Sequence, residues 1–452
     1  MTAGTARQTE RKHHVVIVGG GFAGLGCALR LADDDRVRVT LIDRRNYHQF
    51  QPLLYQVATS QLAPSDTAQS LRAVFAGSRS VRVKLAEISS VDLPARTVRT
   101  GDGDQWAGDA LVLAVGSQPN FFGTPGAPEH SFPLYSLDDA TRLRSRILGI
   151  FEQVDRDPSL VDRGALNFLV VGGGPTGVEV AGAIADMLKV TVPAEYRDID
   201  PGSARVHLVD LGDALLKPFS DRAHEYVARV LCEKGVELHL RTGVREIAGG
   251  HALLTDGSLI LTRCVIWGGG VTAAELTAHC GLGRSRRVDV TPELTVNGHP
   301  GVYAIGDAAN LADRDGAPLP QLGSVALQSG RWAAGNILAE FAGEPTRAFA
   351  YRDKGIMAMI GRGAAIAEVG KARRELRGEL ARLAWLGVHA SLMVGARAKI
   401  EAIINWSWDG FTKTGGPHVL DRAEAAEIDW GQEPAMPAPV QARLAASGLG
   451  VA

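Results

Sequence analysis

The chain has 452 residues, which is enough for two or three domains with full hydrophobic cores. Its formal net charge of −2 lacks the basic excess of nucleic-acid-binding proteins, so we expect no nucleic-acid partner. The four cysteines, Cys27, Cys232, Cys264 and Cys280, lie far apart with no CxxC or metal-ligand spacing. This disfavours a thiol reductase, and we expect no metal. The first 14 residues lack the apolar segment of a secretory signal, which predicts a cytoplasmic, reduced protein.

A glycine-rich loop follows the first apolar segment, residues 15–18, which predicts a buried strand. The loop residues are Gly19, Gly20, Gly21, Phe22, Ala23 and Gly24, and they match GxGxxG. In this pattern the glycines permit a tight turn, a close approach of the backbone to a pyrophosphate, and close helix packing. Residues 37–42 predict a second strand that ends at Asp43, from which a carboxylate can accept hydrogen bonds from ribose hydroxyls.

The next segments complete the first half of this domain. Residues 81–88 and 91–100 are expected to be strands of a small antiparallel piece. Residues 110–115 predict a buried strand that ends at Gly116. The chain then crosses over through a Pro/Gly-rich stretch and a charged helix near residues 137–151.

A second glycine loop follows residues 168–171 and matches the same pattern with Gly172, Gly173, Gly174, Pro175, Thr176 and Gly177. Residues 205–209 predict the next strand, which ends at Asp210. This acid is further from its loop than the usual spacing of about 20 residues, so the segment around 191–201 must lengthen the helix or add a loop. A carboxylate beside the ribose repels a 2′-phosphate, which favours NADH over NADPH.

Two later strands also end in glycine. Residues 264–267 are followed by glycines that include Gly269, and residues 301–305 are followed by Gly306 and Asp307. Ligands of open α/β sheets bind at such carboxyl ends. We therefore predict an α/β protein with two Rossmann-like dinucleotide-binding domains, the second inserted into a split first domain. The expected bounds are 13–118 and 296–370 for the first domain and 119–295, with core 166–271, for the second.

The C-terminal segment is expected to form an amphipathic helical region over residues 371–415. Its apolar residues are interleaved with Arg and Lys, and no run reaches the roughly 18 apolar residues that a spanning helix needs. Two interpretations stay open: a helix lying flat on an anionic membrane surface, and a helix packing on its own domain or on a dimer partner. Residues 421–452 are expected to be disordered, with Trp430 as an anchor.

Four stretches carry a resemblance to a known family. They are Asp43–His48 (DRRNYH), Phe50–Ala58 (FQPLLYQVA), Gly172–Glu179 (GGGPTGVE) and Tyr351–Gly355 (YRDKG). With the order of the glycine motifs, they resemble type II NADH dehydrogenases, the single-subunit NADH:quinone oxidoreductases. The similarity runs from about His14 to Arg362. It implies FAD in the first domain, NADH in the second and a quinone acceptor, in a homodimer peripheral on the inner face of the cell membrane.

The resemblance also implies roles for individual residues. It implies FAD contacts by Gly19, Gly20, Gly21, Phe22, Ala23, Gly24, Asp43, Arg44, Gly116, Gly306, Asp307 and Gly323, and NADH contacts by Gly172, Gly174, Pro175, Thr176, Gly177, Glu179, Asp210 and Gly269. Glu179 is further implicated in quinone protonation. The plainer interpretation is a first-turn carboxylate that complements the helix dipole and pairs with Lys354. Lys354 itself would lie near the flavin or be a solvated loop residue.

The acceptor site departs from the family. The family commonly carries Ala-Gln-x-Ala-x-Gln there, and this chain keeps Gln328 but has Ser324 in place of the first Gln. The shorter hydroxyl loses one amide that could bond a quinone carbonyl. Two alternatives to a quinone reductase therefore stay open: a soluble NADH diaphorase or reductase with a protein or biosynthetic acceptor, and a redox-sensing interaction flavoprotein.

Overall fold

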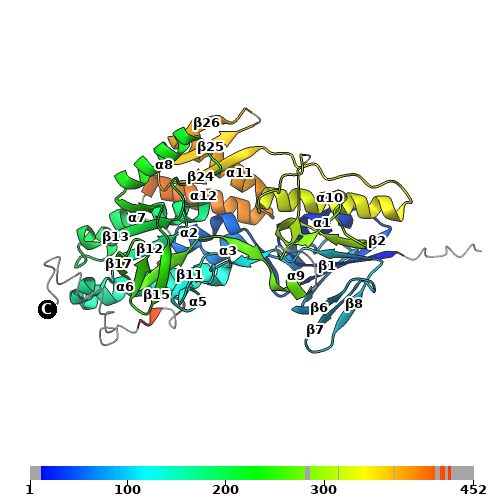
Figure 1. Cartoon of the computed structure of the whole chain (residues 1–452), viewed down its shortest axis with the longest axis horizontal. Coiled ribbons are helices and arrows are strands. Elements are labelled where there is room, and N and C mark those ends of the chain that lie inside the picture. The colour runs from blue at the N-terminus through cyan, green and yellow to red at the C-terminus, as the bar shows by residue number, and fades with distance from the viewer. Residues whose placement is uncertain are drawn as a thin grey trace, which may run out of the picture. The chain divides into compact units, whose positions relative to one another are not determined.

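The structure is a computed structural model that describes residues 12–279, 286–313, 315–370, 372–412, 418–422 and 426–428. Cys280 and Trp430 lie outside the described residues. Two compact units are present, each built around a parallel sheet (Figure 1). Unit 1 contains the described parts of Met1–Gln49, Ala68–Gln118 and Val271–Arg352. Unit 2 contains those of Phe50–Thr67, Pro119–Gly270 and Asp353–Ala452.

Unit 1 has a six-stranded sheet in the order β21-β22-β9-β1-β2-β5. The strands are β1 (His13–Val18), β2 (Val37–Asp43), β5 (Val81–Leu85), β9 (Ala110–Leu113), β21 (Thr295–Val296) and β22 (His299–Ala304). All neighbours are parallel except β21 and β22. Helices α1 (Phe22–Ala32) and α10 (Gly323–Phe341) pack so closely that a Cβ on Gly330 would lie 2.0 Å from the Ala23 carbonyl oxygen. Strands 15–18 and 110–113 are continuously apolar because parallel sheets are covered on both faces.

One prediction for this unit is wrong in its grouping. Residues 81–85 form β5, which pairs in parallel with β2 and is not part of the antiparallel piece. That piece is β6 (Ile88–Asp92), β7 (Thr97–Thr100) and β8 (Gln105–Ala107), so residues 91–100 are parts of two strands joined by a turn. Alternating burial is common to the edge strand of either kind of sheet, so the alternation could not decide between them.

Unit 2 has a five-stranded parallel sheet in the order β11-β18-β12-β13-β14. Its strands are β11 (Ser131–Pro133), β12 (Asn167–Val171), β13 (Arg205–Asp210), β14 (Val236–Leu240) and β18 (Cys264–Trp267). An antiparallel sheet of β15 (Val244–Ala248), β16 (His251–Leu254) and β17 (Leu259–Leu261) contributes to one apolar core with this sheet. Helix α7 (Pro175–Glu195) has 21 residues and is followed by the 3-10 turn η3 (Pro201–Ser203), so the expected insertion both lengthens the helix and adds a loop.

Two further helices of unit 2 are α6 (Leu137–Arg156) and α8 (Asp221–Glu233). The predicted charged helix is confirmed as α6, which begins with a capping box between Ser136 and Asp139.

Short elements connect the main helices and strands of both units. Those described are β3 (Tyr47–Gln49), η1 (Gln51–Leu53), α2 (Leu54–Ala58), α3 (Pro64–Thr67), β4 (Ala68–Ser70), α4 (Leu71–Val74), β10 (Ser117–Pro119), α5 (Ala127–His130), η2 (Pro158–Arg163), β19 (Val271–Ala273), α9 (Glu275–His279), β20 (Val288–Asp289), η4 (Gly306–Ala308) and β23 (Ala309–Asn310).

The C-terminal part of unit 2 is an antiparallel sheet followed by two helices. The elements are β24 (Gly355–Met359), β25 (Ala365–Val369), β26 (Arg374–Arg377), α11 (Gly378–Leu392) and α12 (Ala396–Thr412). Helix α11 packs on β25, and α12 packs on α3. The predicted helical tail is therefore two helices that lie against the rest of this unit.

The predicted disorder from residue 421 onward is wrong for the described residues at its start. Asp421 forms an ion pair of 2.5 Å with Arg144 of α6, whose side chain is only 3% exposed. The Gln153 amide donates to the Ala426 carbonyl at 2.8 Å. A polar, weakly periodic sequence is held here by partners almost 280 residues away in the chain, which local composition cannot show.

Candidate functional site

The first glycine loop has the geometry of a phosphate-binding turn. Gly19 has φ +106°, and a Cβ there would lie 2.2 Å from the Ala114 carbonyl oxygen. A Cβ on Gly24 would lie 1.8 Å from the Gly19 oxygen. In contrast, a Cβ on Gly21, the residue before α1, would meet no atom within 4 Å. The outer glycines are therefore required by the fold, and the middle one leaves an open approach to the helix N-terminus.

The second glycine loop repeats this geometry in unit 2. Gly172 has φ +107°, and a Cβ there would lie 2.4 Å from the Gly268 oxygen. A Cβ on Gly177 would lie 1.7 Å from the Gly172 oxygen, whereas one on Gly174 would again meet nothing within 4 Å. Gly174 directly precedes α7, with Pro175 at the first helical position and exposed. Each unit therefore holds one open turn at a helix N-terminus that fits a pyrophosphate.

An aspartate at the end of the next strand braces each loop. Asp43 accepts from the Gly20 amide at 2.6 Å and from the Arg45 amide at 2.7 Å. Asp210 accepts from the Gly173 and Gly212 amides, both at 2.6 Å. A carboxylate has about four lone-pair sites, so each acid can still accept from a ribose hydroxyl. The two carboxylates thus hold the glycine turns in place, a function that the sequence analysis did not assign to them.

The carboxyl ends of the unit 1 strands gather the remaining FAD candidates. Because β22, β9, β1 and β2 are parallel neighbours, Asp307, Gly116, Gly19 and Asp43 follow their strands at the same edge of the sheet. Asp307 accepts from the Ser117 hydroxyl at 2.8 Å, and burial raises the pKa of its carboxyl.

The other FAD candidates of unit 1 follow the same edge or flank it. A Cβ on Gly306 would lie 2.9 Å from the Ala23 Cβ, and one on Gly323 would lie 3.4 Å from the Phe22 ring. Arg44 is different, since it forms an exposed ion pair of 3.6 Å with Glu87.

His48 was not singled out as a site residue. It lies on β3, 2% exposed, with its ring edge-on to Phe22 at 5.2 Å between centroids. Its Nδ1 donates to the Gly20 carbonyl at 3.0 Å, and burial lowers the pKa of the imidazole. The neutral ring therefore has a lone pair on Nε2, which is buried and has no hydrogen-bond partner among the described residues. A buried acceptor beside the glycine loop fits a hydroxyl of a bound dinucleotide.

Glu179 is a buried acid of unit 2. It lies in the second turn of α7, 8% exposed, and accepts from the Met359 amide at 3.1 Å. Burial raises the pKa of its carboxyl to about 8, against smaller opposing effects of the Met359 amide and the nearby Trp385 indole. The proposed pairing with Lys354 is absent from the described residues, since Lys354 is exposed and its carbonyl accepts from the Gly370 amide. Glu179 is therefore largely protonated at neutral pH.

An aromatic and polar cluster lies beside Glu179 in unit 2, with Tyr55 and Trp385 as its members near the acid. It consists of Tyr55 and Gln56 on α2, Trp385 and His389 on α11, and Trp406 on α12. The Gln56 amide donates to the Tyr55 hydroxyl at 2.9 Å and accepts from the Trp406 indole at 2.8 Å. Trp385 stacks on His389 at 3.8 Å, and burial lowers the pKa of that imidazole to about 4. The pKa of Tyr55 is raised, first by burial and then by the charge of Glu179.

The acceptor candidates of unit 1 already have partners. The Gln328 side chain accepts from the Arg352 amide at 3.0 Å and donates to the Arg352 carbonyl at 3.1 Å. Ser324 shares a hydrogen bond of 2.9 Å with the Tyr351 hydroxyl. Both side chains thus hold residues 351–352 against α10. In unit 2, Gly269 lies next to the Trp267 ring, and the indole donates to the Asn120 carbonyl at 2.8 Å.

The helical tail has two apolar faces. Its inner face buries Ala381, Trp385, Met393, Ala398 and Ala402. Its outer face exposes Leu380, Leu383, Val388, Leu392, Ile400, Ile403, Ile404 and Trp408. No helix among the described residues is long and apolar enough to cross a membrane. Both interpretations of the tail therefore have residues to support them, one set for each face.

The cysteines do not provide dithiol chemistry in the part of the chain that the structure describes. Cys27, Cys232 and Cys264 are free. Burial raises the pKa of the Cys27 and Cys264 thiols to about 12, so neither is a ready nucleophile.

Comparisons with known proteins identify the family of the chain. The pyridine nucleotide-disulphide oxidoreductase family matches residues 13–330. The type II NADH:quinone oxidoreductase Ndh of Mycobacterium tuberculosis is 36% identical over 420 residues, which cover 88% of each chain. That of Haemophilus influenzae is 28% identical and covers 83% of this chain and 92% of the relative. The structure of NDH2 from Plasmodium falciparum with NADH matches with TM-score 0.83 at 19% identity, over 90% of this chain and 100% of that one, which shows the predicted fold. The chain belongs to the pyridine nucleotide-disulphide oxidoreductases and, within them, to the type II NADH:quinone oxidoreductases.

Proposed function

We propose that the chain is an FAD-dependent NADH:quinone oxidoreductase. The observation that carries the proposal is the doubled glycine turn: each unit has two glycines that the fold requires, a middle glycine open toward a helix N-terminus, and an aspartate that braces the turn. A single turn would fit many nucleotide-binding proteins, but two matched turns fit two dinucleotides. The similarity to the mycobacterial and Haemophilus relatives supports a quinone as the acceptor.

The two cofactors are assigned by unit. The turn of unit 1, with Asp43, Asp307 and His48, would hold FAD, and the turn of unit 2, with Asp210, would hold NADH. When bound, FAD supplies the redox chemistry, taking a hydride from NADH and giving two electrons to the acceptor. The protein supplies binding and orientation: N–H groups at the helix starts bind the pyrophosphates, and the Asp210 carboxylate selects against a 2′-phosphate.

Glu179 supplies a proton in this proposal. Its carboxyl holds the proton at neutral pH because it is buried with one amide donor and no cationic partner among the described residues. Quinone reduction consumes two protons, and an acid whose pKa lies near the working pH is suited to deliver one of them. We assign Glu179 as this donor, with water as the source of the other proton.

Gln328 and Lys354 stay predictions as catalytic residues. The amide group of Gln328 bonds to the backbone of Arg352, so it can hold this segment in position but must exchange a partner to contact a quinone. Lys354 is exposed and shows no contact with Glu179. The proposed domain bounds, 13–118, 119–295 and 296–370, likewise stay predictions.

Anaerobic stopped-flow absorbance would test the proposal on the purified, FAD-loaded protein. NADH is expected to bleach the flavin band near 450 nm, and a short-chain quinone is expected to restore it within milliseconds. If NADH bleaches the flavin but the quinone does not reoxidise it, the assignment of a quinone as the acceptor would be contradicted. The protein would then be a diaphorase with another acceptor, an alternative that Ser324 in place of the family Gln leaves open. No bleaching by NADH would contradict the dehydrogenase itself.

We further propose that the outer face of α11 and α12 binds the surface of an anionic membrane. The exposed apolar residues belong to consecutive helices, and Arg397 on α12, which pairs with Glu401 at 2.6 Å, has a side chain that is 89% exposed. Apolar side chains with basic neighbours suit a helix that lies in the lipid interface. A location on the inner face of the cell membrane and a homodimer are further parts of the proposal, the latter testable by the mass of the purified protein in solution.

Sedimentation with anionic lipid vesicles would test the membrane surface. The double variant Ile400→Gln and Ile404→Gln is expected to bind at least about tenfold more weakly, because each buried isoleucine contributes roughly 1.5–3 kcal/mol. Leu85→Gln is the matched control, since Leu85 is an equally exposed apolar residue (59%) in unit 1. Equal binding of the double variant and the control would contradict the assignment of this face.

A further inference from the structure

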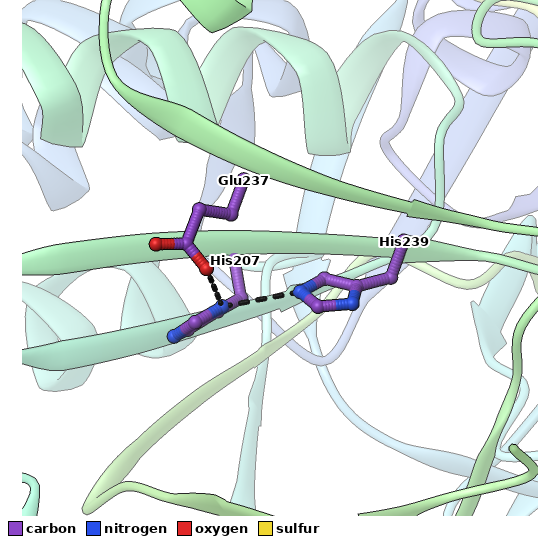
Figure 2. A group of neighbouring side chains, drawn as sticks. All are labelled: His207, Glu237 and His239. Atoms are coloured by element: carbon purple, nitrogen blue, oxygen red, sulfur yellow. Dashed lines mark hydrogen bonds and ion pairs between the residues drawn. The ribbon is translucent and has the colours of Figure 1, made fainter. Parts of the chain in front are cut away.

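Two imidazoles and a carboxylate converge on the surface of unit 2, outside the site described above. His207 lies on β13, and Glu237 and His239 lie on the neighbouring strand β14. The Nδ1 atom of His207 is 3.2 Å from Nε2 of His239 and 3.3 Å from Oε2 of Glu237 (Figure 2). In the part of the chain that the structure describes, this is the one group of three such side chains whose ligand atoms all lie within 4.8 Å of one another.

The sheet register brings these side chains together. His207 pairs directly with Glu237 in the parallel ladder of β13 and β14, and His239 is two residues further along. Side chains two residues apart on a strand lie on the same face. All three therefore project from one face of the sheet at its edge, where β14 is the last strand. The sequence analysis did not single them out, because His207 and Glu237-x-His239 are 30 residues apart in the chain.

The separations fit the edges of a tetrahedron around a metal ion. Zn²⁺ binds histidine nitrogen and carboxylate oxygen at about 2.0–2.1 Å, which places ligand atoms of a tetrahedral site about 3.3–3.4 Å apart. The two separations from His207 Nδ1, 3.2 and 3.3 Å, are close to this edge, and all three ligand atoms lie within 4.8 Å of one another. A hydrogen-bond chain through His207 Nδ1 is the competing interpretation. In that chain a single N–H would have to serve both neighbours, whereas a metal would satisfy all three ligand atoms at once.

Arg205 contacts the carboxylate of this group. Arg205 lies 3.5 Å from the other oxygen of Glu237 and donates to the Gly202 and Ala204 carbonyls, so it fixes the carboxylate while Oε2 faces His207.

We propose that His207, Glu237 and His239 form a binding site for a divalent transition metal of the zinc type, with the fourth position open to water or an external ligand. The donor set of two imidazoles and one carboxylate is typical of such sites, and Ca²⁺ or Mg²⁺ would instead prefer oxygen ligands. The bound ion would link β14 to β13, the strand that ends at Asp210. This site is independent of the proposed redox function and adds a second ligand to the NADH-binding unit.

Titration of the tag-free, full-length protein with Zn²⁺ or Co²⁺ would test the site. After treatment with a chelator and dialysis, calorimetry is expected to show one Zn²⁺ site per chain. Co²⁺ is expected to give the visible absorption of a tetrahedral complex, a readout that does not depend on activity. His239→Gln and Glu237→Gln are each expected to weaken binding at least about 100-fold, since even outer-shell changes weaken metal sites 10–100-fold.

His251→Gln is the control, because His251 is a histidine on β16 of the same unit and is likewise only 9% exposed, as His207 is. It is expected to bind metal like the natural protein. Both ligand variants replace partly exposed side chains, so their folding can be verified by an unchanged thermal unfolding curve in chelator. No stoichiometric binding by the natural protein would overturn the proposal. Binding that persists unchanged in both ligand variants would overturn it as well.

Discussion

Replacement of Glu179 by Gln should change how the stability of the protein depends on pH. The folded carboxyl has a pKa of about 8, and its ordinary value is 4.5. Between these values the folded chain keeps a proton that the unfolded chain has lost, so the free energy of unfolding falls as the pH rises. Full stability from this group is present below pH 4.5, and it is lost as the pH passes through about 8.

The size of the effect follows from the two pKa values. The slope is about 1.4 kcal/mol per pH unit in the middle of the window. The slope becomes smaller near pH 8, where the folded carboxyl itself titrates. Between pH 5.5 and 7.5 the free energy of unfolding of the natural protein should therefore fall by about 2.5 kcal/mol through this group. Glu179 is only 8% exposed, so screening by solvent does not reduce this change in stability. The Gln side chain cannot ionise, so the variant should gain about 2.5 kcal/mol relative to the natural protein over this range.

Urea unfolding followed by tryptophan fluorescence at pH 5.5, 6.5 and 7.5 would measure this difference, with refolding checked at each pH. Val180→Ala is the control: Val180 is fully buried in the same helix and carries no titratable group, so its loss of stability should be constant with pH. A difference between Glu179→Gln and the natural protein that stays constant within about 0.5 kcal/mol would refute a buried, protonated Glu179.

Four further variants test other parts of the structure. Gly174→Ala should fold normally but bind NADH at least about tenfold more weakly in fluorescence titrations. Gly177→Ala should lose about 3 kcal/mol or more of its free energy of unfolding in urea, because the new Cβ would overlap the Gly172 carbonyl oxygen. Asp210→Asn should shift the kcat/KM ratio of NADPH to NADH upward about tenfold, and an unchanged ratio would contradict its assignment. Asp421→Asn should cost about 1–2 kcal/mol in urea unfolding, less than a fully buried pair with Arg144, because Asp421 is 42% exposed.

The parts predicted from sequence are those that local spacing determines. Both glycine turns, the strands before them and the acids at positions 43 and 210 are close in the chain, and the positive φ of Gly19 and Gly172 is a local requirement. The insertion between residues 191 and 201 also followed from a spacing that was longer than usual. The acid at position 307 could be placed because strands of a parallel sheet share one functional edge.

The parts that sequence did not predict depend on contacts between distant segments. His48 becomes a candidate only because its ring lies against Gly20 and Phe22 in space. The group around His207 depends on the register of two strands, which no local pattern encodes. The grouping of residues 81–85 failed for a related reason, since the identity of a strand's partner decides whether an alternating segment belongs to a parallel or an antiparallel sheet.

The tail shows why two interpretations of one sequence can both be needed. Helix α7 starts at an open glycine turn, and Glu179 follows in its second turn. Burial keeps this acid protonated, and Trp385, which belongs to α11 of the tail, lies beside it. The opposite face of the same helix exposes Leu380 and Leu383. The apolar residues of the tail therefore divide into two sets: the inner set is buried and includes Trp385 beside Glu179, and the outer set is exposed. A tail with only one apolar face would have left a single interpretation of its sequence, either packing on the protein or binding to a membrane surface. This tail has one apolar face for each.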